Sequence, residues 1–224
     1  MTKKEEVLLA LEKGDFEKAL GILNICIQNE EFLAWALARK AWILMKKGEW
    51  QQALTFFDKA LEIEPENADF LSERGVTKHL MGAHTSAILD LDHALKLQPN
   101  NPYRYSSRAY VKDFMGDTSG AVEDYKIAIS IDPNDAVAHN NLGMLEEKLG
   151  YKEAAKERFK KADQLADVNG WNKDFVKPTS AEKKEKLKPE KSNSTFDVLK
   201  KLLTDKNIQI EFFQFIKNGF KLKK

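Results

Sequence analysis

A spacing of 34 residues recurs through most of the chain and limits the folds open to it. Three related stretches each close an apolar, alanine-containing run with a proline, at Pro65, Pro99 and Pro133, so that successive prolines lie 34 residues apart. Proline lacks the backbone N–H that a helix interior uses, and it therefore ends a helix. A period of this length in a helical sequence predicts an array of short helical units.

Small residues mark the turn and the packing face of each unit. Glycines recur in register between the two helical patterns of every unit, at Gly14, Gly48, Gly82, Gly116 and Gly150. Glycine adopts the left-handed conformation that ends a helix without a steric cost. Alanines recur in the second helical pattern, at Ala19, Ala53, Ala87, Ala121 and Ala155, where they let two helices approach closely. Each unit is therefore predicted to be a helix–turn–helix hairpin.

The second helical patterns also place an aromatic residue four positions after the alanine. The pairs are Ala53 and Phe57, Ala121 and Tyr125, and Ala155 and Phe159, with Leu91 as the substitute after Ala87. In this spacing the sequence resembles the tetratricopeptide repeat family. The resemblance implies an all-α fold, a right-handed superhelical solenoid of about five 34-residue helix-turn-helix repeats. We expect the units at 1–33, 34–67, 68–101, 102–135 and 136–168.

The chain after the repeats has a different composition. Residues 169–193 are rich in lysine and are predicted to be a linker, whereas residues 194–224 are predicted to form an amphipathic C-terminal helical extension. From Trp171 onward 14 lysines stand against 7 acidic residues, a net charge of +7, and the preceding 170 residues carry −6. An acidic repeat region thus precedes a basic tail.

Two apolar stripes in the tail predict a docking element. They consist of Phe196, Leu199 and Leu203 in one segment and of Phe212, Phe215 and Ile216 in the next. Burying one such side chain is worth roughly 1.5–3 kcal/mol, so several together will find a surface. Three surfaces remain open at this point: the chain's own solenoid, another protein or a second copy, and a membrane.

Charged residues recur in register as well. Arg74 and Arg108, with Lys40 in the equivalent place, precede the small residue of each first helix; Lys78 and Lys112 follow one turn later; and the second helices carry Asp90 and Asp124. Because these charges repeat in phase, we interpret them as an ion-pair ladder that joins the hairpins. The alternative is an anion-binding or catalytic site.

The resemblance also implies which residues face a partner, because the first helices of this family line a concave groove. On that face the expected peptide- or partner-binding residues are Trp35, Trp42, Met45, Tyr103, Tyr110, Asn140 and Met144. Large aromatic side chains are favoured anchors, although some of these can instead pack between repeats. Family members that grip a chaperone's C-terminal carboxylate need lysine, asparagine and arginine on this face, where the chain has Ala38, Ser72 and Ser106. No carboxylate-clamp peptide is expected, and an apolar or helical ligand with some basic character fits better.

Residue patterns for catalysis or for cofactor and metal binding are not found. The four histidines, His79, His84, His93 and His139, fall in different units or on different faces, and none pairs with Cys26 at metal-ligand spacing. No phosphate loop, nucleophile elbow or nucleic-acid-binding motif is present. We therefore expect no enzyme activity, no cofactor and no nucleic-acid partner.

The expected function is a non-enzymatic scaffold or adaptor that binds a protein or peptide in the concave groove. Two alternatives remain, a peripheral membrane adaptor anchored by the basic, Phe-rich tail and a structural protein that self-associates through the tail. A cytoplasmic location is expected, because the single Cys26 cannot form an internal disulfide and no apolar run is long enough to span a membrane.

Overall fold

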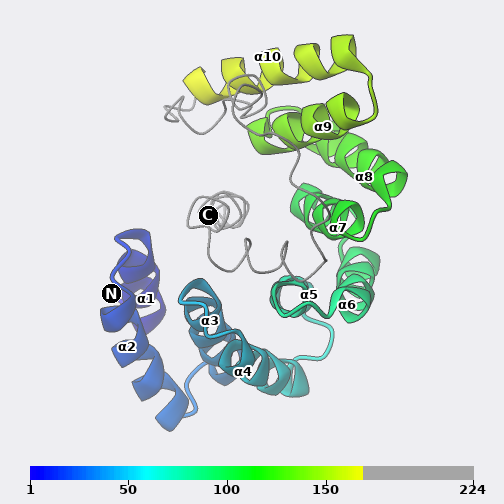
Figure 1. The fold of residues 1–224 in the computed structure, drawn as a ribbon. Coiled ribbons are helices and arrows are strands. Elements are labelled where there is room, and N and C mark those ends of the chain that lie inside the picture. The colour runs from blue at the N-terminus through cyan, green and yellow to red at the C-terminus, as the bar shows by residue number, and fades with distance from the viewer. Residues whose placement is uncertain (169–224) are drawn as a thin grey trace, which may run out of the picture. The chain divides into compact units, whose positions relative to one another are not determined.

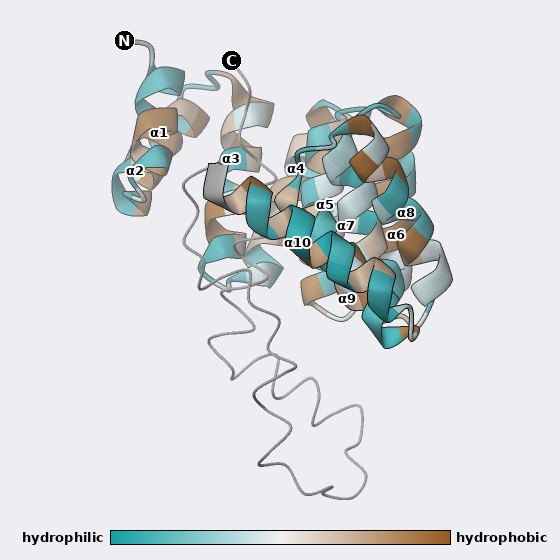
Figure 2. Cartoon of the chain, turned by 90° about the horizontal axis from the view of Figure 1, so that it is seen from above, coloured by the Kyte–Doolittle hydropathy of each residue, from teal (hydrophilic) through white to brown (hydrophobic). Residues whose placement is uncertain are grey.

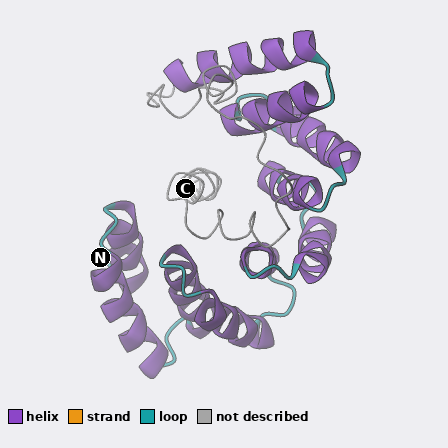
Figure 3. Ribbon diagram, in the orientation of Figure 1, coloured by secondary structure: helices purple, strands orange, loops and turns teal. Residues whose placement is uncertain are grey.

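The computed structural model describes residues 1–168, and these residues form ten α-helices and no strand (Figure 3). The helices are α1 (Lys3–Glu12), α2 (Phe16–Gln28), α3 (Leu33–Lys46), α4 (Trp50–Ile63), α5 (Ala68–Leu80), α6 (His84–Leu97), α7 (Pro102–Phe114), α8 (Thr118–Ile131), α9 (Ala136–Lys148) and α10 (Lys152–Val168). The predicted linker at 169–193, the predicted extension at 194–224 and the six apolar residues predicted to dock lie outside the described residues.

The hairpin turns lie where the glycines predict them. All five in-register glycines have a positive φ, between 72° and 91°. Their amide groups bond to carbonyls in the last turn of the preceding helix, as Gly82 N–H does to His79 at 2.9 Å. This left-handed geometry ends the first helix of each pair and allows the second to begin at once.

The restart of the chain after each proline has a local cause. Asn67, Asn101 and Asp135 lie two residues after the three prolines and cap α5, α7 and α9. Asn67 accepts from the amides of Asp69 and Phe70 at 3.1 and 3.2 Å. An Asn or Asp side chain at this position satisfies amides that have no partner within the helix. Proline therefore ends one hairpin and the cap residue begins the next.

The described residues fall into two compact parts, 1–124 and from 125 onward, and each is described by itself. Within the first part α3 packs on α5 and α5 on α7, while α4 and α6 lie on the other side of this row (Figure 1). The first helices of successive hairpins thus form one layer and the second helices another. The fold is an all-α solenoid of helical hairpins, and the right-handed superhelix stays a prediction.

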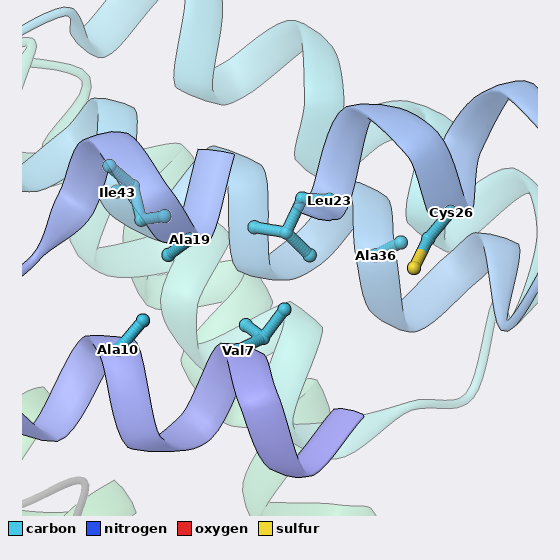
Figure 4. Packing of buried hydrophobic residues seen from close by; sticks show 7 residues of the cluster. All are labelled: Val7, Ala10, Ala19, Leu23, Cys26, Ala36 and Ile43. Atoms are coloured by element: carbon cyan, nitrogen blue, oxygen red, sulfur yellow. The ribbon is translucent and has the colours of Figure 1, made fainter. Parts of the chain in front are cut away.

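The atypical first hairpin is closed by a small apolar cluster. Val7 and Ala10 of α1 face Ala19 and Leu23 of α2, and Cys26 lies beside Ala36 of α3 (Figure 4). Cys26 occupies a place where later units have alanine, and its side chain is fully buried. A cysteine that packs as a small apolar residue keeps the close helix approach that alanine provides elsewhere.

In the second part α9 packs closely on α10. A Cβ on Gly143 would lie 2.8 Å from the ring of Phe159, so glycine is required at this contact. The Asn141 side chain also donates to the hydroxyl of Tyr125 on α8, at 3.3 Å. Much of α10 is hydrophilic (Figure 2), and most of its residues between 152 and 164 are exposed, as a terminal repeat of a solenoid requires.

Candidate functional site

The ion-pair ladder exists and has a regular geometry. The Arg74 guanidinium donates twice to Asp90 at 2.8 Å, sixteen residues later, and once to Asp58 at 2.9 Å, sixteen residues earlier. One repeat later, Arg108 makes the same set of bonds to Asp124 and Asp92, at 2.7–2.8 Å. Each arginine therefore joins the second helix of its own hairpin to that of the preceding hairpin.

A lysine adds a second cation to each ladder aspartate. Lys78 lies 2.8 Å from Asp90, and Lys112 lies 2.9 Å from the nearly fully buried Asp124. The hydrogen bonds that Arg108 donates to Asp124 raise the pKa of Arg108 above its ordinary value. These contacts confirm that the charged residues form an ion-pair ladder that joins the hairpins. The alternative, an anion-binding site, is not favoured, because the cations are already paired with carboxylates.

Lys40 continues the ladder in a weaker form. It donates to Asn24 at 2.8 Å, again sixteen residues earlier, and lies over the ring of Phe56 at 4.6 Å. Phe56 occupies the register position of Asp90 and Asp124. A cation–π contact therefore replaces the forward ion pair in this hairpin.

Buried polar contacts hold the first helices together as one layer. Arg39 of α3 donates to the fully buried Glu73 of α5 at 2.7 Å. Arg104 of α7 donates to the Ala68 carbonyl and the Ser72 hydroxyl of α5, both at 2.6 Å. Burial raises the pKa of Glu73 to about 7, although Arg39 opposes this shift. Sequence reasoning missed both contacts. The first could have been found, because Arg39 and Glu73 are opposite charges one 34-residue period apart.

Four of the predicted partner-binding residues form what we call the α3–α7 surface, defined by Trp35 and Trp42 on α3 and by Tyr103 and Tyr110 on α7. All four are half-buried. Trp35 and Tyr103 hold equivalent repeat positions, as do Trp42 and Tyr110, and α5 lies between the two helices. Between the aromatic residues the layer carries small buried residues, Ala38, Ser72 and Ser106.

The aromatic rings of the α3–α7 surface are held by neighbours. Trp42 packs edge-on against Phe16 with ring centroids 6.2 Å apart, and the Lys46 ammonium lies 5.1 Å from its ring. Tyr110 packs edge-on against His79 at 5.3 Å. Rings held in this way lose little conformational entropy on binding, which suits them to be anchors.

Four buried polar atoms on α3 and α7 find no hydrogen-bond partner among the described residues. Two are the Nε atoms of Arg39 and Arg104, whose guanidinium groups bond through their other nitrogens. The other two are the indole N–H of Trp42 and the hydroxyl of Ser106. Buried polar groups are nearly always paired in native proteins, and an unpaired one calls for an explanation such as an absent ligand. These groups are suited to hydrogen bonding with a bound chain.

The remaining predicted residues fall elsewhere. Met45 is a correction, because its side chain is fully buried and is therefore not exposed to a partner. Asn140 and Met144 lie one turn apart on α9, in the second part of the chain, with Met144 exposed and Asn140 half-buried. The helical period gives the face on which Met45 lies but not the depth to which its side chain is buried.

A histidine pair corrects a second prediction. His79 and His84 were expected on different faces, yet their Nδ1 atoms lie 3.0 Å apart across the turn, beside Tyr110 and Phe114. Burial, with a smaller contribution from His84, lowers the pKa of His79 to about 4. In the next hairpin Thr118 donates to Asp113 at 2.9 Å, and these two residues hold the positions equivalent to His84 and His79. We therefore interpret the histidine pair as a contact that stabilises the turn between two helices.

Among residues 1–168 no group of three or more metal-ligating side chains forms a metal site.

These features define the class of protein: a helical-hairpin repeat protein with an aromatic surface on its first helices. Family models of the tetratricopeptide repeat match residues 34–67 and 136–169, and a TPR repeat model matches residues 115–150. The chain belongs to the tetratricopeptide repeat family. No curated protein matches the sequence at a significant level.

Solved structures share the fold. MamA from Desulfovibrio magneticus RS-1 superposes with a TM-score of 0.63 at 22% identity, over 74% of this chain and 94% of that chain. YrrB, described as a TPR protein with an unusual peptide-binding site, does so with a TM-score of 0.55 at 21% identity, over 71% and 82%. The first TPR domain of Spaghetti, bound to an HSP90 peptide, reaches 0.50 at 22% identity, over 52% and 93%. At these identities the likeness shows the fold alone.

No helix within residues 1–168 combines the length and the apolar character needed to cross a bilayer.

Proposed function

We propose that this chain is a non-enzymatic scaffold that binds a peptide or a helix on the α3–α7 surface. The observation that carries the proposal is the pairing of held aromatic rings with buried, unpartnered polar groups, at Trp42 and Ser106. Aromatic residues of this kind dominate the binding energy of many interfaces. Peptide binding by the similarly folded YrrB and Spaghetti domains supports the same class of function.

The charges of the first-helix layer favour a ligand without a clamped carboxylate. Arg39, a cation near this face, is committed to the buried Glu73. Arg104 is likewise committed to acceptors on α5. A terminal carboxylate needs charge-assisted donors that are not already used. We therefore propose an apolar or helical ligand, with some basic character because residues 1–124 contain 15 basic and 20 acidic side chains.

The same contacts support the proposal that the chain is not an enzyme. Asp90 and Asp124, the most buried aspartates of the ladder, are each held by an arginine and a lysine. Both carboxylate oxygens of each aspartate are held by its arginine, so neither aspartate is placed to take a proton from a substrate.

Selection from a phage-displayed peptide library tests the proposal. Peptides selected on the intact chain are titrated against wild type and against the double variant Trp42→Ala/Tyr110→Ala by fluorescence polarisation. We expect the double variant to lose at least tenfold in affinity, because it removes one anchor from each end of the surface. Phe56→Ala is the matched control, since Phe56 is a half-buried aromatic residue on the second-helix layer. Equal affinity of the wild type and the double variant would exclude the α3–α7 surface as the site.

A further inference from the structure

We propose that the resident ligand of the α3–α7 surface is the chain's own C-terminal segment, residues 194–224, bound as an amphipathic helix. The inference rests on the proposed function, because it uses the same surface and names its occupant. The segment lies outside the described residues, and the argument uses only its sequence and the surface that the structure describes.

The apolar chemistry of the two partners matches. Three aliphatic or aromatic residues at helical spacing, Phe212, Phe215 and Ile216, form a stripe that needs an apolar surface. The α3–α7 surface supplies half-buried rings on two helices, with small residues between them. An amphipathic helix laid across such a layer buries its stripe against the rings, as in other helix-binding surfaces.

The charges are complementary. Residues 194–224 carry 7 lysines and 3 acidic residues, a net charge of +4, whereas residues 1–124 carry −5. On the surface itself Asp69 of α5, aligned with Trp35 and Tyr103, accepts a bond from Arg104 at 2.9 Å and still keeps 54% of its side chain exposed. Opposite net charges steer the two partners together and disfavour another acidic chain as the occupant.

The covalent connection favours this occupant over a separate molecule. The 25 residues of 169–193 join the segment to the end of α10 at Val168. A tether of this length holds its two ends at an effective concentration on the order of millimolar. A second copy of the chain at micromolar concentration therefore competes poorly with the attached segment.

The buried polar groups fit a bound chain. Trp42 and Ser106 present an N–H and a hydroxyl without a partner among the described residues. Gln209 precedes Phe212 by three residues and Ile216 by seven, so on a helix it lies on the side of the stripe, and its side-chain carbonyl oxygen can accept such a bond. A docked segment would therefore supply a partner to a group that the solenoid leaves unpaired.

Amide hydrogen exchange of the intact chain, read by mass spectrometry, tests the inference. In the wild type we expect residues 194–220 to exchange at least tenfold more slowly than an unstructured chain. Trp42→Ala/Tyr110→Ala should remove this protection, and so should Phe212→Asp/Phe215→Asp. Phe56→Ala and Gln214→Ala are the controls on the two partners, and both should leave most of the protection in place.

Each other outcome overturns the inference. Fast exchange in the wild type means that the segment is available to a different partner or to a membrane. Protection that survives Trp42→Ala/Tyr110→Ala means that the segment docks elsewhere. Protection that increases between 1 and 100 µM protein identifies the segment of a second copy as the occupant.

Binding of the peptides selected on the intact chain distinguishes a failure of this inference from a failure of the proposed function. If the segment is the resident ligand, Phe212→Asp/Phe215→Asp removes a competitor, and the selected peptide should bind about tenfold more tightly. If the segment is unprotected but the selected peptide still requires Trp42 and Tyr110, only the occupant is wrong. If neither the segment nor the peptide depends on these residues, the proposed function fails as well.

Discussion

At the scale of single residues, burial separates the ion pairs that stabilise this fold from those that do not. Asp124 is only 2% exposed and receives two bonds from Arg108 and one from Lys112. Glu17 and Lys47 form a pair at 3.0 Å in which the carboxylate is mostly exposed. The same ionic chemistry thus has very different consequences, because water screens the second pair and not the first.

Asp124→Ala should lower the free energy of unfolding by about 2–3 kcal/mol, since it leaves two half-buried cations, Arg108 and Lys112, with less compensation. Urea denaturation followed by circular dichroism measures this loss. Glu17→Ala is the control and should leave the unfolding midpoint almost unchanged. Comparable losses in the two variants would show that the ladder contributes no more than a surface pair.

His79 makes stability depend on pH. Its pKa is about 4 in the folded chain, against an ordinary 6.5, because burial disfavours the charged ring. The unfolded chain therefore takes up this proton more readily, so the stability due to neutral His79 is complete above pH 6.5 and is lost as the pH falls toward 4.

His79→Phe should weaken this acid sensitivity. Between pH 7.5 and 4.5 we expect the wild type to lose about 2 kcal/mol more in unfolding free energy than the variant. Urea titrations at the two pH values provide the comparison. The same loss in both proteins would show that His79 is protonated equally easily in the folded and unfolded chain.

At the scale of helices, glycine has opposite effects at turns and in helix interiors. Gly82 has φ +83°, a conformation that residues with a side chain rarely adopt. Gly21 lies inside α2, and a Cβ there would meet nothing within 4 Å. The first glycine is required by the backbone and the second is not.

Gly82→Ala should destabilise the chain by about 1–2 kcal/mol, whereas Gly21→Ala should stabilise it by about 1 kcal/mol. Thermal unfolding of the two variants measures both effects, as a lower and a higher midpoint. A rise in the midpoint of Gly82→Ala would contradict the turn assignment.

At the scale of the whole molecule, a repeat array transmits a defect mainly to adjacent units. Arg74 joins Asp58 of α4 to Asp90 of α6. Arg74→Met should therefore speed amide exchange in α4, α5 and α6 and leave α1 and α2 nearly unchanged, because α1 and α2 lie outside the affected contacts. Uniformly faster exchange from α1 to α7 would instead indicate one cooperative block.

Much of the fold could be predicted, because the repeat architecture depends on local features of the sequence. The glycines, the prolines and the alanine columns act through backbone conformation and close helix approach, which need only neighbouring residues. The Arg74 and Arg108 ladder was also predictable, since an interaction repeated in register must be a stacking contact. The cap residues Asn67, Asn101 and Asp135 were equally visible in the sequence but were missed.

The sequence by itself thus determined the helices, their turns and the pairing of hairpins, because each depends on local conformation and on a fixed period. Only the tertiary structure decided that Met45 is buried, that Trp42 carries an unpaired N–H, and that His79 meets His84. Helical periodicity places a residue on a face, but the depth of that residue depends on how closely the next helix packs. Exposure and hydrogen bonding, and with them the candidate site, follow from that packing.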